Sequence, residues 1–192
     1  MKELTKNRAA LLRLFYTNPD QSYYMQEIGR ILGKKPGYFQ RTLNKMVDEQ
    51  ILVSEPKANV RYFKANKDYQ LYEELKSIVF KTVGVLGSIR EIFQNVGGVE
   101  YCFIYGSFAK NEQTSMSDVD LVVVGDVDED IIIKKLDRLE QVLKREINYK
   151  LYTLNEFRRV LRNKEPFVSE IVRDKKTMVI GDEDELRKIP RK

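Results

Sequence analysis

The sequence predicts an α+β protein of two domains joined by a helical linker, and three patterns carry this prediction. In residues 1–68, apolar residues recur three times at helical spacing, and two short β-type runs follow them. A long helical pattern fills residues 69–97. Over residues 98–192, strand-like runs alternate with helical patterns, which is typical of an α/β domain, here expected to hold a mixed sheet.

Composition excludes several classes of protein. Charged residues make up 33% of the chain and apolar residues 42%, which is typical of a globular protein and not of a disordered one. The chain has no apolar run near the roughly 18 residues of a membrane helix, and its first residues lack a signal-peptide pattern. We therefore expect a soluble protein without a membrane partner. The single cysteine, Cys102, can form no internal disulfide, so the expected compartment is the cytoplasm.

The chain contains no histidine, which restricts its chemistry further. Histidine triads and histidine general bases are excluded, and a zinc site would have to use carboxylates and one thiol.

The net charge of +5 is unevenly distributed. Residues 1–68 hold 13 Lys and Arg against 7 Asp and Glu, a net charge of +6, which leaves −1 for residues 69–192. A basic segment beside a near-neutral one suggests different partners for the two parts, and nucleic acid is the usual partner of a basic segment.

The first domain is predicted to contain three helices and then a hairpin. The first helical pattern ends at the turn signal TNPD, and the second ends at Gly33, a good left-handed C-cap. The third begins at Pro36, whose fixed φ suits the first turn of a helix. Two β-type runs, 51–54 and 60–63, then flank the turn EPKAN.

This order resembles the winged helix-turn-helix domains of MarR- and ArsR-type regulators, over roughly residues 5–66. The resemblance implies double-stranded DNA as a partner, bound by a dimer, with the third helix in the major groove and the hairpin at the phosphates. The DNA-binding residues that it implies are Lys34, Lys35, Tyr38, Arg41, Asn44, Lys45, Lys57 and Arg61. The alternative is that these side chains only solvate the surface, but the confinement of the charge surplus to this domain favours DNA binding.

The helical pattern of residues 69–97 predicts one long helix or two, with Gly84 and Gly87 as breaks or points of close packing. The stretch RYFKANKDYQLYEELKSIVFKTVG resembles the connector of regulators in which a winged helix is fused to a nucleotidyltransferase-like domain.

Two aspartates, Asp118 and Asp120, stand in the valine-rich strand pattern SDVDLVVVG. Two residues along a strand are about 6.5–7 Å apart, so both carboxylates can turn toward the same divalent ions. Like charges on one face of a sheet repel, and a strand tolerates them mainly when a cation neutralises them. Taken alone, the pair would fit an edge strand with its polar face in water.

The pair Gly106-Ser107, which ends the preceding strand pattern, favours a functional site instead. A glycine lets the backbone approach a phosphate closely, and a serine that opens a helix can offer its hydroxyl and amide to phosphate oxygens. Phosphate donors and a metal-binding carboxylate pair are what nucleotidyl transfer requires.

Gly106-Ser107, ten residues and then Asp118-Val119-Asp120 resemble the signature of DNA polymerase β-type nucleotidyltransferases, most closely the minimal members. The resemblance runs from about residue 98 to 181. It implies that Gly106 and Ser107 hold the triphosphate of an NTP, expected to be ATP, and that Asp118 and Asp120 are catalytic and bind two Mg²⁺ (or Mn²⁺) ions. Lys110 stands where minimal members often carry a basic residue that contacts the nucleotide.

The sequence departs from this pattern at Asn148. The family usually takes a third carboxylate from the later strand, here INYKLYT, where Asn148 occupies the position. An amide cannot act as a base at neutral pH and binds metals more weakly than a carboxylate. Glu146, two residues earlier, is the one nearby carboxylate that could replace it.

Three functions stay open in the sequence. The chain could be a DNA-binding regulator whose nucleotidyltransferase domain binds Mg²⁺–NTP as a sensor, the reading that Asn148 favours. It could be an active minimal nucleotidyltransferase that modifies a protein or a small molecule, with the winged helix as a targeting module; minimal members often modify a tyrosine of a helical HEPN-type partner. In the third reading the domain only dimerises, which the joint presence of Gly106, Ser107, Asp118 and Asp120 argues against.

Overall fold

The computed structural model of the chain describes residues 6–114 and 117–189. Its contacts divide the chain into two compact units, Met1–Gly87 with Gln141–Lys144 and Ser88–Glu140 with Arg145–Lys192. Within the described ranges, no helix is both long enough and apolar enough to cross a membrane.

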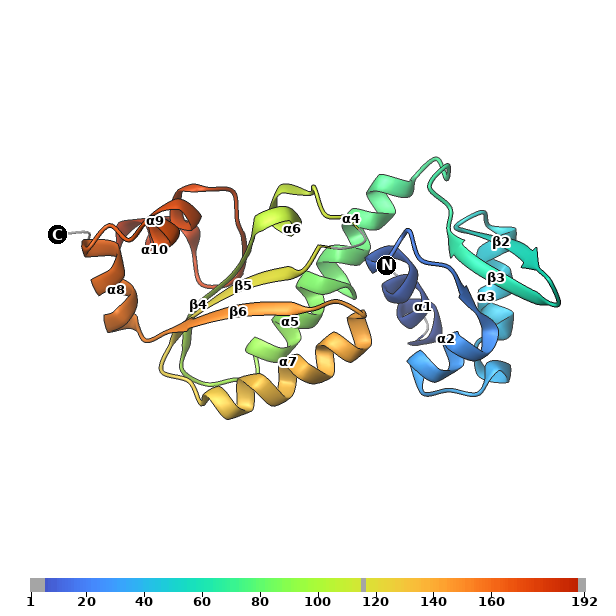
Figure 1. The fold of residues 1–192 in the computed structure, drawn as a ribbon, viewed down its shortest axis with the longest axis horizontal. Coiled ribbons are helices and arrows are strands. Elements are labelled where there is room, and N and C mark those ends of the chain that lie inside the picture. The colour runs from blue at the N-terminus through green and yellow to red at the C-terminus, as the bar shows by residue number, and fades with distance from the viewer. Residues whose placement is uncertain (1–5, 115–116, 190–192) are drawn as a thin grey trace. The chain divides into compact units, whose positions relative to one another are not determined.

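The first unit combines helices with a small sheet. Its elements are α1 (Lys6–Thr17), β1 (Tyr23–Tyr24), α2 (Met25–Leu32), η1 (Pro36–Tyr38), α3 (Gln40–Asp48), β2 (Leu52–Lys57), β3 (Val60–Ala65) and α4 (Tyr72–Thr82). The three strands form an antiparallel sheet in the order β1-β3-β2, and β2 and β3 make a hairpin (Figure 1). The three helices and the hairpin that the sequence predicts are present in this order.

The third helix begins later than its proline predicts. Pro36–Tyr38 form a single 3-10 turn, and α3 starts only at Gln40. The backbone leaves the helical path at Phe39, where φ is −127°, and the ring of Phe39 is fully buried. Because the chain turns here to place this ring in the core, Lys35 and Tyr38 lie ahead of α3 and not on it.

The core of the first unit is built mainly from the inward faces of α1, α3 and the hairpin. Its fully buried side chains include Leu11, Leu12, Leu14, Phe15, Ile28, Phe39, Leu43, Met46 and Phe63. Tyr72 and Val79 of α4 belong to the same core, and the ring of Tyr72 packs against Tyr16 at 5.5 Å between centroids. Helix α4, which lies in the predicted linker, therefore packs on the α1–α3 core.

The linker region forms two helices, since α4 ends at Thr82 and α5 (Val85–Phe93) begins after a break. The Gly84 amide donates a hydrogen bond of 2.6 Å to the Val79 carbonyl oxygen, and a Cβ on Gly84 would lie 2.7 Å from that oxygen. A Cβ on Gly87 would lie 1.7 Å from the Thr82 carbonyl oxygen. Both glycines are needed for the close backbone approach at this break.

The second unit is an α/β unit with one sheet. Its remaining elements are β4 (Val99–Tyr105), α6 (Gly106–Lys110), β5 (Val119–Gly125), α7 (Glu129–Leu143), β6 (Ile147–Tyr152), α8 (Leu154–Arg162), α9 (Pro166–Arg173), β7 (Thr177–Ile180) and α10 (Glu183–Lys188). The strand order is β6-β5-β4-β7. β5 and β6 are parallel and connected through α7, whereas the other pairs are antiparallel, so the predicted mixed sheet is confirmed.

Strand β5 is buried on both faces of this sheet. Val122 and Val124 share a core with side chains of α8, α9 and α10. The residues of the opposite face are fully buried as well: Val119, Leu121 and Val123. Asp120 lies on the same face as Val122, at the amino-terminal end of the strand. Figure 1 shows α6 and α7 on opposite sides of the strands.

Candidate functional site

The sheet brings together one row of polar side chains from three neighbouring strands. Asp120 of β5 lies opposite Tyr105 of β4 on one side and opposite Asn148 of β6 on the other. Residues that face each other across a strand pair project to the same side of the sheet. Asp118 lies just before β5, not within it as the alternation predicted, but its carboxylate Oδ2 still accepts a hydrogen bond of 3.3 Å from the Asn148 amide.

The turn after β4 lies directly against this row. Gly106 has a φ of +68°, a left-handed conformation that glycine adopts without strain. A Cβ built on Gly106 would lie 2.5 Å from Asp120 Oδ2, which is closer than side chains pack. Glycine at this position therefore lets the Gly106-Ser107 backbone sit next to the carboxylate. Ser107 lies in α6, a helix of five residues that begins at Gly106.

The Asp120 carboxylate lies in an environment that resists its charge. Burial raises the pKa of Asp120 above its usual value, the nearby Asp118 carboxylate raises it further, and the Asn148 amide partly offsets both effects. Among the described residues, no lysine or arginine forms an ion pair with either aspartate. Within the described ranges the pair therefore has no neutralising cation from a side chain.

These residues fit a divalent cation. Oxygen ligands from carboxylates are what Mg²⁺ and Mn²⁺ prefer, and a cation would relieve the repulsion that raises the pKa of Asp120. In the part of the chain that the structure describes, no group of three or more His, Cys, Asp or Glu side chains is placed to hold a metal ion. Glu146 lies outside β6 with an exposed side chain and does not complete such a group.

Lys110, the residue expected to contact the nucleotide, is engaged by a residue that sequence reasoning missed. Its ammonium group lies 3.0 Å from Oδ2 of Asp174, which follows α9. This hydrogen bond is the main cause of a raised Lys110 pKa. Both side chains are largely exposed, so the pair is weak and a polyphosphate could displace Asp174. No local pattern points to Asp174, because only the fold brings the end of α9 beside α6.

The sequence also matches a family model described as "Polymerase beta, Nucleotidyltransferase" over residues 87–184. The chain belongs to this nucleotidyltransferase family. The matched segment contains every residue of the row described above. No curated protein is significantly similar to the chain.

The chain is only distantly similar to solved structures. One is described as a toxin–antitoxin with AMP-PNP; it has 16% sequence identity, covers 54% of this chain and 79% of its own, and has a TM-score of 0.40. Another is a tri-AMPylated HEPN toxin of Shewanella oneidensis in complex with an MNT antitoxin, with 13% identity, coverage of 54% and 76%, and a TM-score of 0.36. These similarities are too low to bear on activity or partners.

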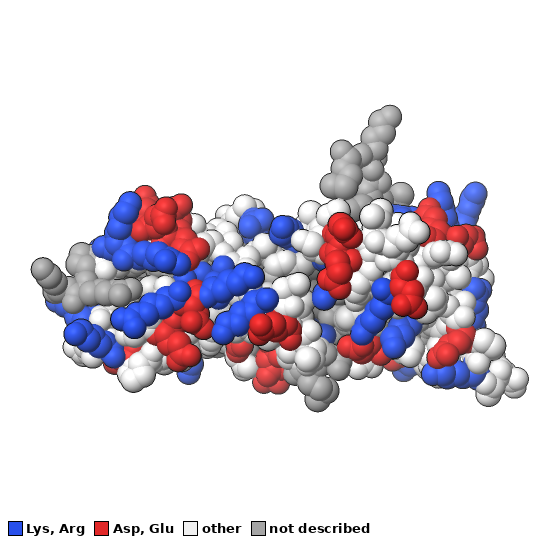
Figure 2. Space-filling view, turned by 90° about the horizontal axis from the view of Figure 1, so that it is seen from above, with Lys and Arg blue, Asp and Glu red and all other residues white. Residues whose placement is uncertain are grey.

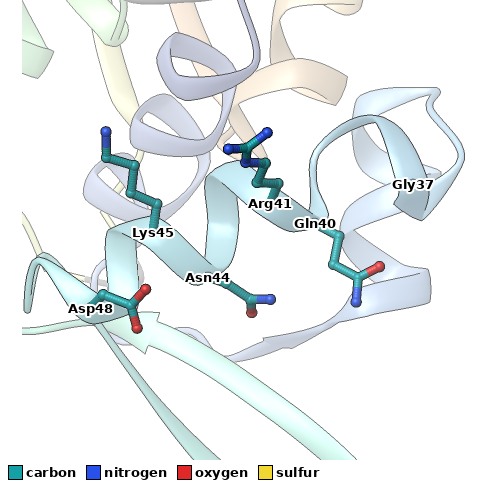
Figure 3. Close-up of a pocket in the computed structure, with 6 residues that line it drawn as sticks. All are labelled: Gly37, Gln40, Arg41, Asn44, Lys45 and Asp48. Atoms are coloured by element: carbon teal, nitrogen blue, oxygen red, sulfur yellow. The ribbon is translucent and has the colours of Figure 1, made fainter.

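Apart from the nucleotidyltransferase domain, the surface of α3 contains a hollow whose lining includes three residues predicted to bind DNA, Arg41, Asn44 and Lys45. The hollow has a volume of about 550 Å³ and is lined by Gly37, Gln40, Arg41, Asn44, Lys45 and Asp48 (Figure 3). A second hollow of about 250 Å³ shares Gln40 and Asn44 and includes Arg61 of the hairpin. Arg41 and Lys45 are exposed, and Lys45 has only a distant ionic partner, Glu49 at 3.9 Å.

The other predicted DNA-binding residues do not gather on this hollow. Lys34 donates a hydrogen bond of 2.7 Å to Asn7, and Lys57 forms an ion pair of 2.7 Å with Glu55. Arg61 donates to Ser54 at 2.9 Å and reaches Asn44 at 3.4 Å, so it links the hairpin to α3. Lys35 and Tyr38 are exposed on the turn ahead of the helix.

The near-neutral charge of residues 69–192 conceals a local basic surface on the nucleotidyltransferase domain. The exposed basic residues of α8, α9 and the loops that follow them are Arg158, Arg159, Arg162, Lys164, Arg173 and Lys175. None of these six forms an ion pair with any residue in the described ranges. Figure 2 shows Lys and Arg gathered toward the end of the molecule where Figure 1 labels α8, α9 and α10. The charge total of residues 69–192 does not reveal these basic residues, because acidic residues, among them Glu165 and Glu170 in the same stretch of chain, cancel them.

Proposed function

We propose that the chain is a minimal nucleotidyltransferase that binds an NTP with Mg²⁺ or Mn²⁺ and transfers its nucleoside monophosphate to a hydroxyl group. Membership of the family supports the reaction class. The observation that carries the proposal is the close approach of the Gly106-Ser107 turn to the Asp120 carboxylate, where a Cβ on Gly106 would lie 2.5 Å from Asp120 Oδ2. The groups that would donate hydrogen bonds to a polyphosphate therefore lie next to the carboxylate that would bind a metal ion.

The roles of the residues follow from their positions. Asp118 and Asp120 would hold the divalent ions, which when bound neutralise phosphate charge as it shifts during transfer. The backbone and hydroxyl of Gly106-Ser107 would contact phosphate oxygens. Lys110 would exchange its ion pair with Asp174 for a phosphate of the NTP.

The transfer forms a bond between the acceptor oxygen and the α-phosphorus and breaks the bond from that phosphorus to pyrophosphate, which leaves. Because the Asn148 amide cannot accept the hydroxyl proton at neutral pH, we expect this proton to go to water. We therefore expect slow turnover compared with a site that has a third carboxylate.

The first unit would direct this activity. The element order α1-β1-α2-α3-β2-β3 and the antiparallel sheet support a winged helix. In this proposal it is a targeting or partner-binding module, and a tyrosine hydroxyl on a helical HEPN-type protein is the expected acceptor.

A second candidate function is a DNA-binding regulator whose nucleotidyltransferase domain senses Mg²⁺–NTP, and two observations favour it. Asn148 removes the base, and α3 presents exposed Arg41 and Lys45 beside a hollow. A dimer that places one α3 in each of two major grooves would be the DNA-binding form.

Incubation with each α-³²P-labelled NTP and Mg²⁺ or Mn²⁺, with and without proteins encoded nearby, tests these functions. Label transferred to a protein, and lost in an Asp118→Asn, Asp120→Asn variant, supports the enzyme. An Asp126→Asn, Asp130→Asn variant makes the same charge change at exposed positions and should keep the activity. If no label is transferred but bound NTP changes the affinity for DNA, the regulator is supported instead.

A further inference from the structure

Helix α9 contacts the end of β4 near its start and α6 just past its end. The ring of Phe167, in its first turn, contacts the ring of Tyr105 edge-on, with 5.7 Å between centroids and an interplanar angle of 78°. Asp174, just past its last turn, pairs with Lys110. Phe167, Glu170 and Asp174 are spaced at i, i+3 and i+7 and so form one stripe of the helix.

Phe167 is the apolar member of this stripe and is left partly in water. Its side chain is 39% exposed, whereas Val168, Ile171 and Val172 of the same helix are buried in the core of the unit. These three residues form the buried face of α9, and Phe167 lies outside it. An aromatic ring that faces solvent beside a polar site is available for a planar ligand.

Tyr105 fixes the position of this ring relative to the site. It lies opposite Asp120 in the register of β4 and β5, and Gly106 follows it directly. Tyr105 is itself only partly buried and packs on the core that contains Val168 and Ile171. Tyr105 is thus directly opposite the carboxylate that would hold a metal and immediately precedes the Gly106-Ser107 turn, so its partner ring, Phe167, lies near both.

We propose that the exposed ring of Phe167, held edge-on by Tyr105, stacks on the nucleobase of the NTP whose phosphates lie at Gly106, Ser107 and the two aspartates. This proposal rests on the proposed nucleotide site. In an NTP the base and the 5′-phosphate chain are attached to C1′ and C4′ on the same face of one ribose, so an aromatic ring close to the phosphate turn lies within reach of the base. We call the ring of Phe167 the base platform. Because every base has a π-face, this platform should add affinity for the NTP and discriminate little among the four bases.

The chain has no tryptophan, which makes a direct test possible. A Phe167→Trp variant carries its only indole at the platform. ATP with Mg²⁺ should quench its fluorescence, and inorganic triphosphate with Mg²⁺ should not. The matched control is Ile133→Trp on α7, where the replaced side chain is 37% exposed and ATP should have no effect. Equal responses of the Phe167→Trp variant to ATP and inorganic triphosphate would overturn the proposal.

Calorimetric titration gives the second measurement. Phe167→Leu keeps an apolar contact for Tyr105 but has no π-face, so its affinity for ATP should fall about tenfold while its affinity for inorganic triphosphate is unchanged. Phe167→Tyr should bind ATP as the wild type does. If Phe167→Leu binds ATP as tightly as the wild type does, the ring of Phe167 does not stack on the base.

The same titration separates this proposal from the proposed function. If the wild type binds ATP and inorganic triphosphate equally well, the phosphate site stands and the base platform falls. If it binds neither ligand with Mg²⁺, both proposals fall.

Discussion

Asn148 donates a hydrogen bond of 3.3 Å from its side-chain amide to Oδ2 of Asp118. It also lies opposite Asp120 in the parallel register of β5 and β6. The resemblance to the family places a third carboxylate at this position. Here the position holds an amide, which orients Asp118 and cannot accept a proton at neutral pH.

Replacing this amide with a carboxylate should accelerate transfer. In Asn148→Asp the new side chain can accept the proton of the attacking hydroxyl, and a positioned general base contributes about 10²–10⁴-fold. We expect the initial rate of label transfer from an α-labelled NTP to rise by roughly 10²-fold or more. Asn155→Asp, the same change at an exposed position of α8, should leave the rate unchanged. An unchanged rate in Asn148→Asp would show that this position does not face the acceptor.

Gly106 is the position where a single methyl group should damage the site. Gly106→Ala places a side chain at a φ of +68° and brings its Cβ within 2.5 Å of Asp120 Oδ2, so the turn or the carboxylate must move. We expect the free energy of unfolding to fall by about 1–2 kcal/mol and Mg²⁺-dependent ATP binding to weaken at least about tenfold. Gly97→Ala is the control in the same unit, since Gly97 has open space around it and no left-handed φ. Equal ATP affinities of the two variants would contradict the close approach.

Asp120 should reduce the stability of the metal-free protein at neutral pH. Because its pKa is raised in the folded state, the folded protein holds this proton more tightly than the unfolded chain does. The cost of ionisation is absent below the unfolded-state pKa and is fully present above the raised folded-state pKa. Asp120→Asn should therefore increase the melting temperature by roughly 1–3 °C at about pH 8 and by nothing at about pH 3.

Divalent ions should reverse this difference. Mg²⁺ stabilises a folded state that binds it, so it should raise the melting temperature of the wild type and leave Asp120→Asn unchanged. A metal-free variant that melts below the wild type at about pH 8 would mean that the Asp120 carboxylate makes a stabilising contact, which is contrary to its raised pKa.

The α3 surface predicts a salt-dependent interaction with DNA. Arg41→Ala and Lys45→Ala each remove one exposed cation beside the hollow of α3, so each should weaken binding and reduce the slope of log K against log salt by about 1. Fluorescence anisotropy with duplex DNA at several salt concentrations measures both effects. Lys81→Ala, an exposed lysine on α4, serves as the control. Slopes that match the wild type would exclude these side chains from phosphate contacts.

The sequence predicted the parts of the fold that depend on local chemistry. The order of strands and helices follows from apolar periodicity, and the break at Gly84 follows from a residue without a Cβ. Thr153 and Glu156, a T-x-x-E pair in the sequence, form a capping box at the start of α8 with reciprocal side-chain and backbone hydrogen bonds. The late start of α3 was missed because the burial of Phe39 outweighs the preference of Pro36 for a first helical turn.

The candidate site was predictable only where its residues are close in sequence. Asp118 and Asp120 share one motif, and Gly106 could be linked to them through a known signature. The ion pair of Lys110 with Asp174 and the ring contact of Tyr105 with Phe167 depend on where α9 packs. No local pattern encodes that packing, because it results from burying one face of α9 on the sheet.

The strand order β6-β5-β4-β7 also sets when the site can first exist during synthesis. A ribosome-bound chain that has emerged only as far as Gly125 already contains Gly106, Asp118 and Asp120, but one edge of β5 is unpaired. Asn148 reaches its place opposite Asp120 only after α7 and β6 have followed. The nascent protein thus cannot hold a nucleotide in the finished geometry until the later strands have left the exit tunnel, so nucleotide binding and any modification of a partner come after folding of this unit.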